Sequence, residues 1–380
     1  MQVEAFRLTR FQHRRDRVIG DSQVRFDQAN IATLELTTDT GATGLGFVSS
    51  LFHPLPALAE IERVFRVEAW PALEGAAPAA LVHRLHRPRG GNIHAMSLPF
   101  GEAINQALWD LAAQQAGLPL WRLLGGVREK VRVYASGLDY HLSDKHFTEF
   151  FGTAAAQGYG AFKIKVGHPD VAWDLRRLAL LRAAVGPAAP VMVDANEAWS
   201  PKEAIRRLDA YRRAGHDILW IEDPCLRDDF AALREVRAGI GGVHVNSGEY
   251  LDLRGKRMLM EARGADLLNV HGNISDVMRA GWLANEHGIG ITLGNTMLEL
   301  GVHLASALPE AEWLEYSFQN YNHLVEQPIL MRDGHAIAPE RPGHGLVLSE
   351  TARRAHAAPE PLTELPTAPR SGPINLTGDS

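Results

Sequence analysis

The sequence predicts an α/β protein built as a (β/α)7-8 TIM-like barrel with an α+β capping domain. From Val131 onward, short apolar runs alternate with helical patterns, and acidic side chains stand where successive runs end. Strands buried in a parallel sheet are near-continuous apolar runs, and a barrel keeps its functional groups at the C-terminal ends of its strands. An open doubly wound sheet is the alternative, but acids at successive strand ends favour the barrel.

Residues 1–127 are predicted to form the capping domain. Alternation of apolar and polar residues predicts strands, and apolar residues three and four positions apart predict helices. The expected strands are 3–9, 31–37 and 45–48, and the expected helices are 56–66 and 101–116. Between the first two strands, residues 12–28 are rich in arginine and are expected to form a polar loop.

Residues 128–318 are predicted to form the barrel. Ser200 and Pro201 mark the start of one helix and Ser275 opens another, because serine caps helix N-termini and proline suits the first helical position. The expected strands are 131–136, 161–166, 191–196, 218–223, 243–249, 265–271, 288–293 and 313–316.

Residues 319–380 are irregular and are expected to pack back on the capping domain and complete it. Proline and glycine interrupt this segment repeatedly. Beyond Ala358 the chain is rich in Pro, Thr and Ser, and this tail is expected to be either an ordered arm or disordered.

Composition narrows the class of protein. The 380 residues are 46% hydrophobic and 22% charged, as in an ordinary globular protein, and the net charge of −6 argues against nucleic-acid or anionic-membrane partners. The single cysteine, Cys225, excludes an internal disulfide and suits a reducing compartment. The N-terminus lacks the apolar core of a signal peptide and no apolar run is long enough to span a bilayer, so a cytoplasmic location is expected.

Three acids at strand ends predict a metal site. Glu222 follows Asp194 by 28 residues and Glu249 follows Glu222 by 27, which is one β/α unit per step. Their carboxylates should therefore converge at the mouth of the barrel. Oxygen ligands without His or Cys fit Mg²⁺ first and Mn²⁺ second. Any one of these acids alone would be better explained as a helix cap or a surface ion pair.

Two lysines on the preceding strand predict a base. Lys163 and Lys165 are two residues apart, so they share one face of the strand and point into the barrel. Each is expected to lower the pKa of the other, and a nearby metal ion would do the same, which would give a neutral amine. A solvated edge strand is the alternative explanation.

Further polar residues stand at later strand ends. His271 ends the sixth strand, across the barrel from the lysines, and Glu315 ends the eighth, where it could hydrogen-bond a developing enolate oxygen. Asn196 and Asn295 are candidate substrate contacts. In the capping domain, Arg17 and Arg25, together with His53, are candidates to grip the polar end of a substrate. For each of these residues an ordinary solvated or structural role is the alternative.

The motifs together resemble the enolase superfamily, in the group of mandelate racemase and muconate lactonizing enzyme. Similar segments extend over nearly the whole chain: ALWDLAAQQAGLPLWRLLGG (107–126), FKIKVG, VDANEAW, IEDP, SGE and RPGHGL. The resemblance implies that Asp194, Glu222 and Glu249 bind Mg²⁺, that Lys165 is a base, and that Lys163 holds the substrate carboxylate or tunes Lys165. It implies that Glu315 hydrogen-bonds the substrate carboxylate, and it suggests a homo-oligomer, either a dimer or an octamer.

One feature departs from the racemase-like pattern. Such members pair an Asp at the end of strand six with a His at the end of strand seven, whereas this strand seven ends Thr292-Leu293-Gly294-Asn295 and His271 stands near the place of the Asp. We therefore expect a Lys165/His271 pair and a small carboxylate substrate. The leading hypothesis is dehydration of a sugar acid or hydroxy acid through an enolate. The alternatives are an isomerase (epimerase, racemase or lactone cycloisomerase) and a non-catalytic metal-dependent binder.

Overall fold

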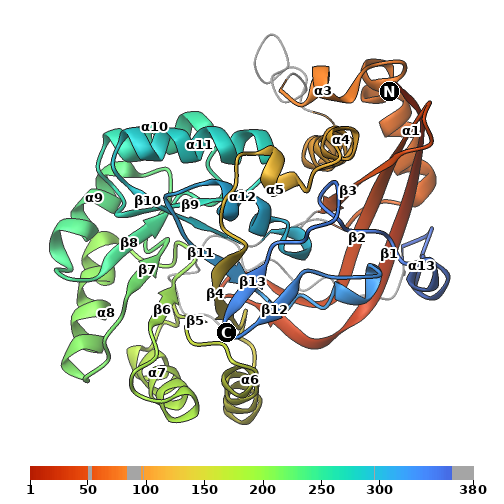
Figure 1. Ribbon diagram of the computed structural model, residues 1–380. Helices are drawn as coiled ribbons and strands as arrows, with labels where there is room; N and C mark the ends of the chain where they lie inside the picture. The colour runs from red at the N-terminus through yellow and green to blue at the C-terminus, as the bar shows by residue number, and fades with distance from the viewer. Residues whose placement is uncertain (50–53, 84–95, 97, 295, 362–380) are drawn as a thin grey trace.

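The computed structural model describes residues 1–49, 54–83, 96, 98–294 and 296–361, and it has two parts (Figure 1). A closed barrel of parallel strands surrounded by helices lies beside a capping layer made of a long antiparallel sheet and helices. The predicted barrel with its α+β cap is confirmed, and the open doubly wound sheet is excluded because strand β11 pairs with strand β4 and closes the cylinder.

The cap is a three-stranded antiparallel sheet covered by helix α4. The strands are β1 (Val3–Gly20), β2 (Arg25–Thr38) and β3 (Thr43–Ser49); the helices are α1 (Leu58–Glu68), α2 (Trp70–Leu73), α3 (Pro78–Leu81), α4 (Phe100–Ala116) and α5 (Leu120–Leu123). Gly44 and Gly46 in β3 allow α4 to approach closely, because a Cβ atom at either position would collide with a carbonyl oxygen of that helix.

The prediction of a polar loop over residues 12–28 is wrong. Strand β1 continues to Gly20, and β2 begins at Arg25, so the segment is the end of a long hairpin. Its arginines extend their side chains to solvent or to neighbouring backbone while the backbone pairs, and this pairing outweighs the polar composition of the segment. The turn of the hairpin places Asp21 at the mouth of the barrel.

Eight strands among the described residues form the barrel. They are β4 (Lys130–Ser136), β5 (Phe162–Lys165), β6 (Val191–Asp194), β7 (Trp220–Glu222), β8 (His244–Ser247), β9 (Leu267–Val270), β10 (Gly290–Leu293) and β11 (Ala311–Tyr316). Most begin later or end sooner than predicted, because the flanking apolar residues lie in the connecting turns rather than in the ladder.

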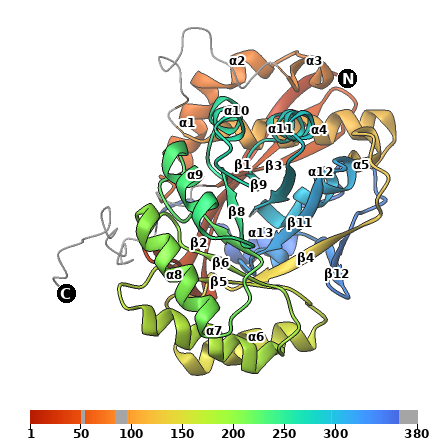
Figure 2. The ribbon, with the colours of Figure 1, turned by 90° about the vertical axis from the view of Figure 1, so that its left-hand side faces the viewer.

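Helices follow the strands and form the outer ring (Figure 2). They are α6 (Asp144–Ala156), α7 (Val171–Val185), α8 (Pro201–Arg213), α9 (Phe230–Gly239), α10 (Leu253–Glu261), α11 (Ile274–Glu286) and α12 (Gly301–Ala307), the last preceded by a 3-10 turn, η2 (Met297–Glu299). Most begin at a residue whose side chain accepts a backbone N–H bond, a cap that stabilises a helix by about 1 kcal/mol. The capping residues are Ser143, Asp170, Ser200, Asp229, Asp252 and Asn273.

The interior of the barrel has an apolar floor and a charged upper layer. Tyr134, Met192, Trp220, Leu267 and Trp313 pack together at the lower level. Because side chains two positions apart share one face of a strand, the residues above Met192, Trp220 and Trp313 on the same face are Asp194, Glu222 and Glu315. The floor therefore excludes water from below the charged layer.

The C-terminal segment crosses from the barrel back to the cap, as predicted. It comprises a 3-10 turn, η3 (Asn322–Leu324), the hairpin β12 (Leu330–Arg332) and β13 (His335–Ile337), and helix α13 (Glu350–His356). His344 is fully buried; its N–H donates to Asp110 in the cap at 2.8 Å and its ring lies 2.7 Å from the Leu45 carbonyl oxygen. Arg353 pairs with Glu35 of the cap at 2.8 Å. The tail from residue 362 lies outside the described residues.

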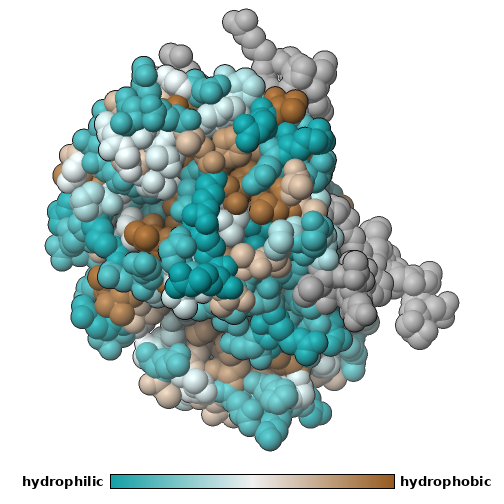
Figure 3. All heavy atoms as spheres, turned by 90° about the vertical axis from the view of Figure 1, so that its right-hand side faces the viewer, coloured by the Kyte–Doolittle hydropathy of each residue, from teal (hydrophilic) through white to brown (hydrophobic). Residues whose placement is uncertain are grey.

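Hydrophilic residues dominate the outer face of the cap, and hydrophobic ones appear between them in separate groups (Figure 3). No helix in the described part of the chain is long and apolar enough to cross a lipid bilayer.

Candidate active site

The centre of the site is a buried network of lysines and acids. Lys165 Nζ lies 2.6 Å from Asp194 Oδ2, and Lys163 Nζ lies 2.6 Å from Glu222 Oε1 and 3.2 Å from Glu315 Oε1. Each side chain in this network is less than a tenth exposed. The strands set this arrangement, because Lys165 pairs with Asp194 and Asp194 with Glu222 across the parallel ladders.

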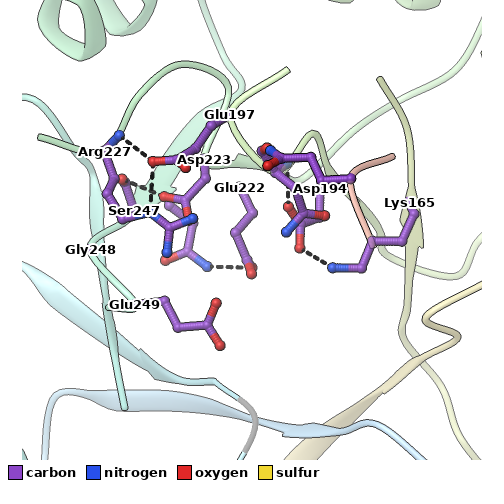
Figure 4. A network of polar contacts seen from close by, with 12 residues as sticks. Lys165, Asp194, Glu197, Glu222, Asp223, Arg227, Ser247, Gly248 and Glu249 are labelled. Carbon is purple, nitrogen blue, oxygen red and sulfur yellow. Dashed lines mark hydrogen bonds and ion pairs between the residues drawn. The ribbon is translucent and has the colours of Figure 1, made fainter. Parts of the chain in front are cut away.

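The third acid, Glu249, lies on the opposite side of Glu222 from Asp194, and the carboxylates of all three acids face one space (Figure 4). Glu249 stands two residues beyond the end of β8, and its carboxylate makes no hydrogen bond or ion pair with any residue that the structure describes. No three His, Cys, Asp or Glu side chains in the described ranges form a ready metal cluster. Two of the three candidate carboxylates are instead bound to lysine.

The acids and lysines perturb each other strongly. Burial raises the pKa of Glu222 well above its ordinary range, and repulsion by Asp194, Glu315 and Glu249 adds to the rise, although Lys163 opposes it. Burial would raise the pKa of Asp194 as well, but Lys165 and Lys163 outweigh it and lower that pKa. The site therefore holds more negative charge than its lysines neutralise, which suits a cation.

The prediction that the lysines would have lowered pKa values is wrong for this arrangement. Burial lowers the pKa of Lys165 and repulsion by Lys163 lowers it further, but attraction to Asp194, Asp21 and Glu315 together outweighs both and the pKa is raised. Attraction to Glu222 and Glu315 likewise outweighs burial and raises the pKa of Lys163. Sequence reasoning considered the two amines and not the acids in contact with them.

A second set of contacts orients the acids from behind. Asn246 Nδ2 donates to Glu222 Oε2 at 3.1 Å, and Thr292 Oγ1 donates to Asn246 at 3.0 Å. Asp223 accepts the Ser247 hydroxyl at 2.6 Å and pairs with Arg227 at 3.2 Å. These contacts hold Glu222 and its neighbouring loop in one orientation.

The network opens into a cavity of about 60 Å³ between the barrel and the cap hairpin. The cap contributes one acid, Asp21, and apolar side chains; the barrel contributes the lysines and acids. The lining residues are Ile19, Gly20, Asp21, Val24, Phe26, Leu138, Lys163, Lys165, Asp194, Asn196, Glu222, Glu249, Tyr250, Glu315 and Gln319. The cap hairpin therefore forms one wall of the site.

The structure does not bring the predicted cap arginines to this cavity. Arg17 donates to the backbone carbonyls of Phe318 at 2.8 Å and of Gly137 at 2.9 Å, so its guanidinium joins the cap to the barrel. Arg25 is exposed and absent from the lining. Neither arginine lines the cavity, because the Arg17 guanidinium contacts carbonyl oxygens and Arg25 faces solvent, and a contact of either with substrate stays a prediction. His53 lies outside the described residues.

Among the other candidates, Asn196 lines the cavity and its N–H donates to Asp194 Oδ1 at 2.9 Å. His271 follows β9 and does not line the cavity; its ring packs edge-on against Tyr250, with ring centroids 5.5 Å apart, and Tyr250 does line it. A direct role for His271 opposite Lys165 stays a prediction. Asn295 lies outside the described residues.

Sequence reasoning missed several residues at the site. Asp21 was not predicted because its hairpin was expected to be a loop. Tyr250 was not predicted because it follows Glu249 directly and has no metal-binding group. Asp139, fully buried, accepts the Lys165 N–H at 3.2 Å, and burial raises its pKa to about 6. Asn246 was the one with a signal: it is a polar residue inside a strand predicted to be buried, a position that usually requires a hydrogen-bond partner.

A capped parallel barrel with lysines and carboxylates gathered at its mouth is the architecture of the enolase superfamily. Residues 9–125 match the family model for the mandelate racemase/muconate lactonizing enzyme N-terminal domain, and residues 147–352 match the enolase C-terminal domain-like model. The chain belongs to the mandelate racemase/muconate lactonizing enzyme family of this superfamily.

Three similar proteins illustrate the range of the family. The 3,6-anhydro-alpha-L-galactonate cycloisomerase of Streptomyces coelicolor is 31% identical, over 84% of this chain and 89% of its own. A Mesorhizobium loti protein whose crystal structure carries the provisional name mandelate racemase is 58% identical, with a TM-score of 0.92, covering 98% of this chain and 100% of that one. The L-talarate/galactarate dehydratase of Salmonella typhimurium, solved with Mg and L-lyxarohydroxamate, is 26% identical, with a TM-score of 0.79, covering 94% and 93%. Other relatives are named as epimerases.

Proposed function

We propose that the protein is a Mg²⁺-dependent enzyme that removes the α-proton of a small carboxylate substrate to form an enolate, and that its overall reaction is dehydration of a sugar acid or hydroxy acid. The observation that carries the proposal is the contact between Lys165 and Asp194, in one cavity with Glu222 and Glu249. Sugar-acid dehydratases among the relatives support it, and one of these binds magnesium in its crystal structure.

The residues present fit a hard divalent cation. Asp194, Glu222 and Glu249 would hold it, since carboxylate oxygens are the ligands that Mg²⁺ prefers. Repulsion among these acids, expressed in the raised pKa of Glu222, is what a cation would relieve. A bound Mg²⁺ supplies positive charge that stabilises the negative charge developing on the substrate carboxylate.

The roles of the protein groups follow from their positions. A cation held by Asp194 would weaken the attraction that raises the pKa of Lys165, and Lys165 then accepts the α-proton at Nζ. Lys163, kept charged by Glu222 and Glu315, donates to the substrate carboxylate. Glu315 lines the same cavity and is the candidate to hydrogen-bond a substrate oxygen. His271 does not line the cavity but packs against Tyr250, which does, and we propose it as the group that delivers a proton to the departing β-hydroxyl group in a dehydration.

Lactone cycloisomerisation is the second candidate. Two relatives that align over most of this chain are named as cycloisomerases: the Streptomyces protein, and a D-galactarolactone cycloisomerase of Agrobacterium fabrum that is 28% identical over 95% of this chain. The same α-proton removal would then be followed by ring opening, with a ring oxygen in place of water as the leaving group.

A substrate screen separates the two candidates. The purified protein is incubated with Mg²⁺ and panels of sugar acids, their lactones and anhydro acids. Appearance of 2-keto-3-deoxy acids from the open sugar acids supports dehydration, and ring-opened products from lactones or anhydro acids alone support cycloisomerisation. Inactivity on all panels, with Mg²⁺ bound, would count against both.

A further inference from the structure

Glu249 differs from the other two candidate metal ligands in how its backbone is held. Asp194 and Glu222 are the last residues of β6 and β7, so the hydrogen-bonded ladder of the barrel fixes them. Glu249 lies beyond the end of β8, in a turn where Gly248 adopts a φ of +108°. Among the residues that the structure describes, neither the ladder nor a hydrogen bond to its carboxylate sets the position of Glu249.

Lys256 holds this turn. It lies in the second turn of α10, is 3% exposed, and points its ammonium group at the backbone of the turn. Nζ donates to the carbonyl oxygens of Gly248, of Glu249 at 3.2 Å and of Leu251 at 2.6 Å. An ammonium group has three N–H donors, and the three acceptors found here all belong to this turn.

Burying an ammonium group costs several kcal/mol unless hydrogen bonds compensate, and an apolar side chain could pack at the same place without that cost. The compensation here comes from the carbonyls around Glu249, and the charge of Lys256 also attracts Glu249 and Asp223. The lysine therefore fixes a particular backbone path rather than simply filling space.

We propose that Lys256 is a positioning residue for metal binding, which presents Glu249 to the cation by clamping the turn between β8 and α10. The inference rests on the proposed function, because it takes Glu249 as a metal ligand. Lys256 positions Glu249 through the hydrogen bonds that its ammonium group donates to three carbonyl oxygens of the turn.

The test measures metal affinity directly, by titration calorimetry with Mg²⁺ and by electron paramagnetic resonance with Mn²⁺. Lys256→Met keeps the length of the side chain and removes its donors. We expect its dissociation constant for the metal to rise by roughly 10–100-fold, as for other groups that orient metal ligands. Arg257→Met, which removes a positive charge from an exposed position on the same helix, should leave the affinity unchanged.

A double-mutant cycle with Glu249→Gln distinguishes positioning from general stabilisation. If Lys256 acts through Glu249, Lys256→Met should cause little further loss of affinity in the Glu249→Gln protein. Equal losses in both backgrounds, or an unchanged affinity in Lys256→Met, would overturn the inference. Lys256→Gln, whose amide keeps two N–H donors, is measured if Lys256→Met does not fold; failure of both variants to fold would show a purely structural role and also overturn it. Failure of the unmodified protein to bind either metal would instead contradict the proposed function.

Discussion

The amino group of Lys165 lies 2.6 Å from a carboxylate oxygen of Asp194, and both groups are buried where neighbouring strands end together. One side chain is thus the candidate base and its partner a candidate metal ligand. Replacing Asp194 should therefore affect both functions together. For Asp194→Asn we expect metal affinity to fall by at least roughly tenfold, and turnover to remain impaired at saturating Mg²⁺. Calorimetry and steady-state kinetics at several Mg²⁺ concentrations would check this; full recovery at high Mg²⁺ would limit Asp194 to metal binding.

Lys163 is predicted to stabilise the fold as well as to serve the reaction. Lys163→Ala leaves Glu222 and Glu315 buried without their cation, and breaking a buried ion pair in this way costs about 3–5 kcal/mol. Lys163→Met/Glu222→Met removes charges on both sides and should recover part of that loss. Chemical denaturation of the three proteins measures the difference. A single variant as stable as the unmodified protein would show that these charges are solvated.

The apolar floor of the barrel gives a prediction independent of the chemistry. Trp220 is fully buried and packs against Tyr134 and Trp313, with ring centroids 5.3 and 6.4 Å away. Trp220→Ala should lower the free energy of unfolding by about 3–5 kcal/mol. Trp282→Ala is the matched control: this tryptophan is 60% exposed, and its loss should change stability by only about 0.5 kcal/mol. Similar effects of both substitutions would contradict the packing described for the floor.

Acid should destabilise the protein through a histidine remote from the site. His303 is fully buried, and burial lowers its pKa from 6.5 to about 3. Its Nδ1 accepts the Trp121 N–H at 3.2 Å, which requires the neutral ring. Because the folded state disfavours the proton, the stability contribution is complete above pH 6.5 and is lost as the pH falls from 6.5 towards 3.

The measurement is the free energy of unfolding as a function of pH for His303→Gln and for His287→Gln, an exposed control. The glutamine at position 303 can still accept a hydrogen bond and does not titrate, so its decline in acid should be shallower. The control should follow the unmodified protein. Identical pH profiles for all three proteins would contradict the assignment.

His271 provides the sharpest test among the catalytic predictions. If it transfers a proton to the leaving group, His271→Asn should lower turnover by roughly 10²–10⁴-fold and leave metal affinity intact. Tyr250→Phe separates the direct role from one transmitted through the adjacent ring, because Tyr250 lines the cavity and His271 does not. Near-normal turnover in His271→Asn, with a large loss in Tyr250→Phe, would assign the proton transfer to the tyrosine.

The barrel could be predicted from sequence because its signals are local. Apolar runs such as Val191–Asp194 end in acids at a regular spacing, and a closed parallel barrel requires that pattern. The same spacing predicted that Lys165, Asp194 and Glu222 lie side by side at the ends of neighbouring strands, as the strand pairing shows. Such a prediction is possible because the backbone fixes how side chains alternate along a strand.

Contacts between distant segments could not be predicted in the same way. The arginine-rich stretch around Arg17 has the composition of a loop, yet it pairs as a hairpin because the cap sheet and carbonyls near Phe318 provide partners. The raised pKa values of Lys163 and Lys165 depend on acids from other strands. The contacts of Lys256 could not be predicted from the sequence, because only the folded turn shows which carbonyl oxygens its ammonium group reaches.

The central claim is that Lys165 removes the α-proton, and it is tested most directly with a substrate carrying deuterium at the α-carbon. The acid identified by the screen is prepared in this form, and release of deuterium to water is followed by nuclear magnetic resonance with Mg²⁺ present. We predict that the unmodified protein releases the label, and that Lys165→Ala, still folded and still binding Mg²⁺, releases it roughly 10²–10⁴-fold more slowly. Release at the same rate by both proteins would contradict the account.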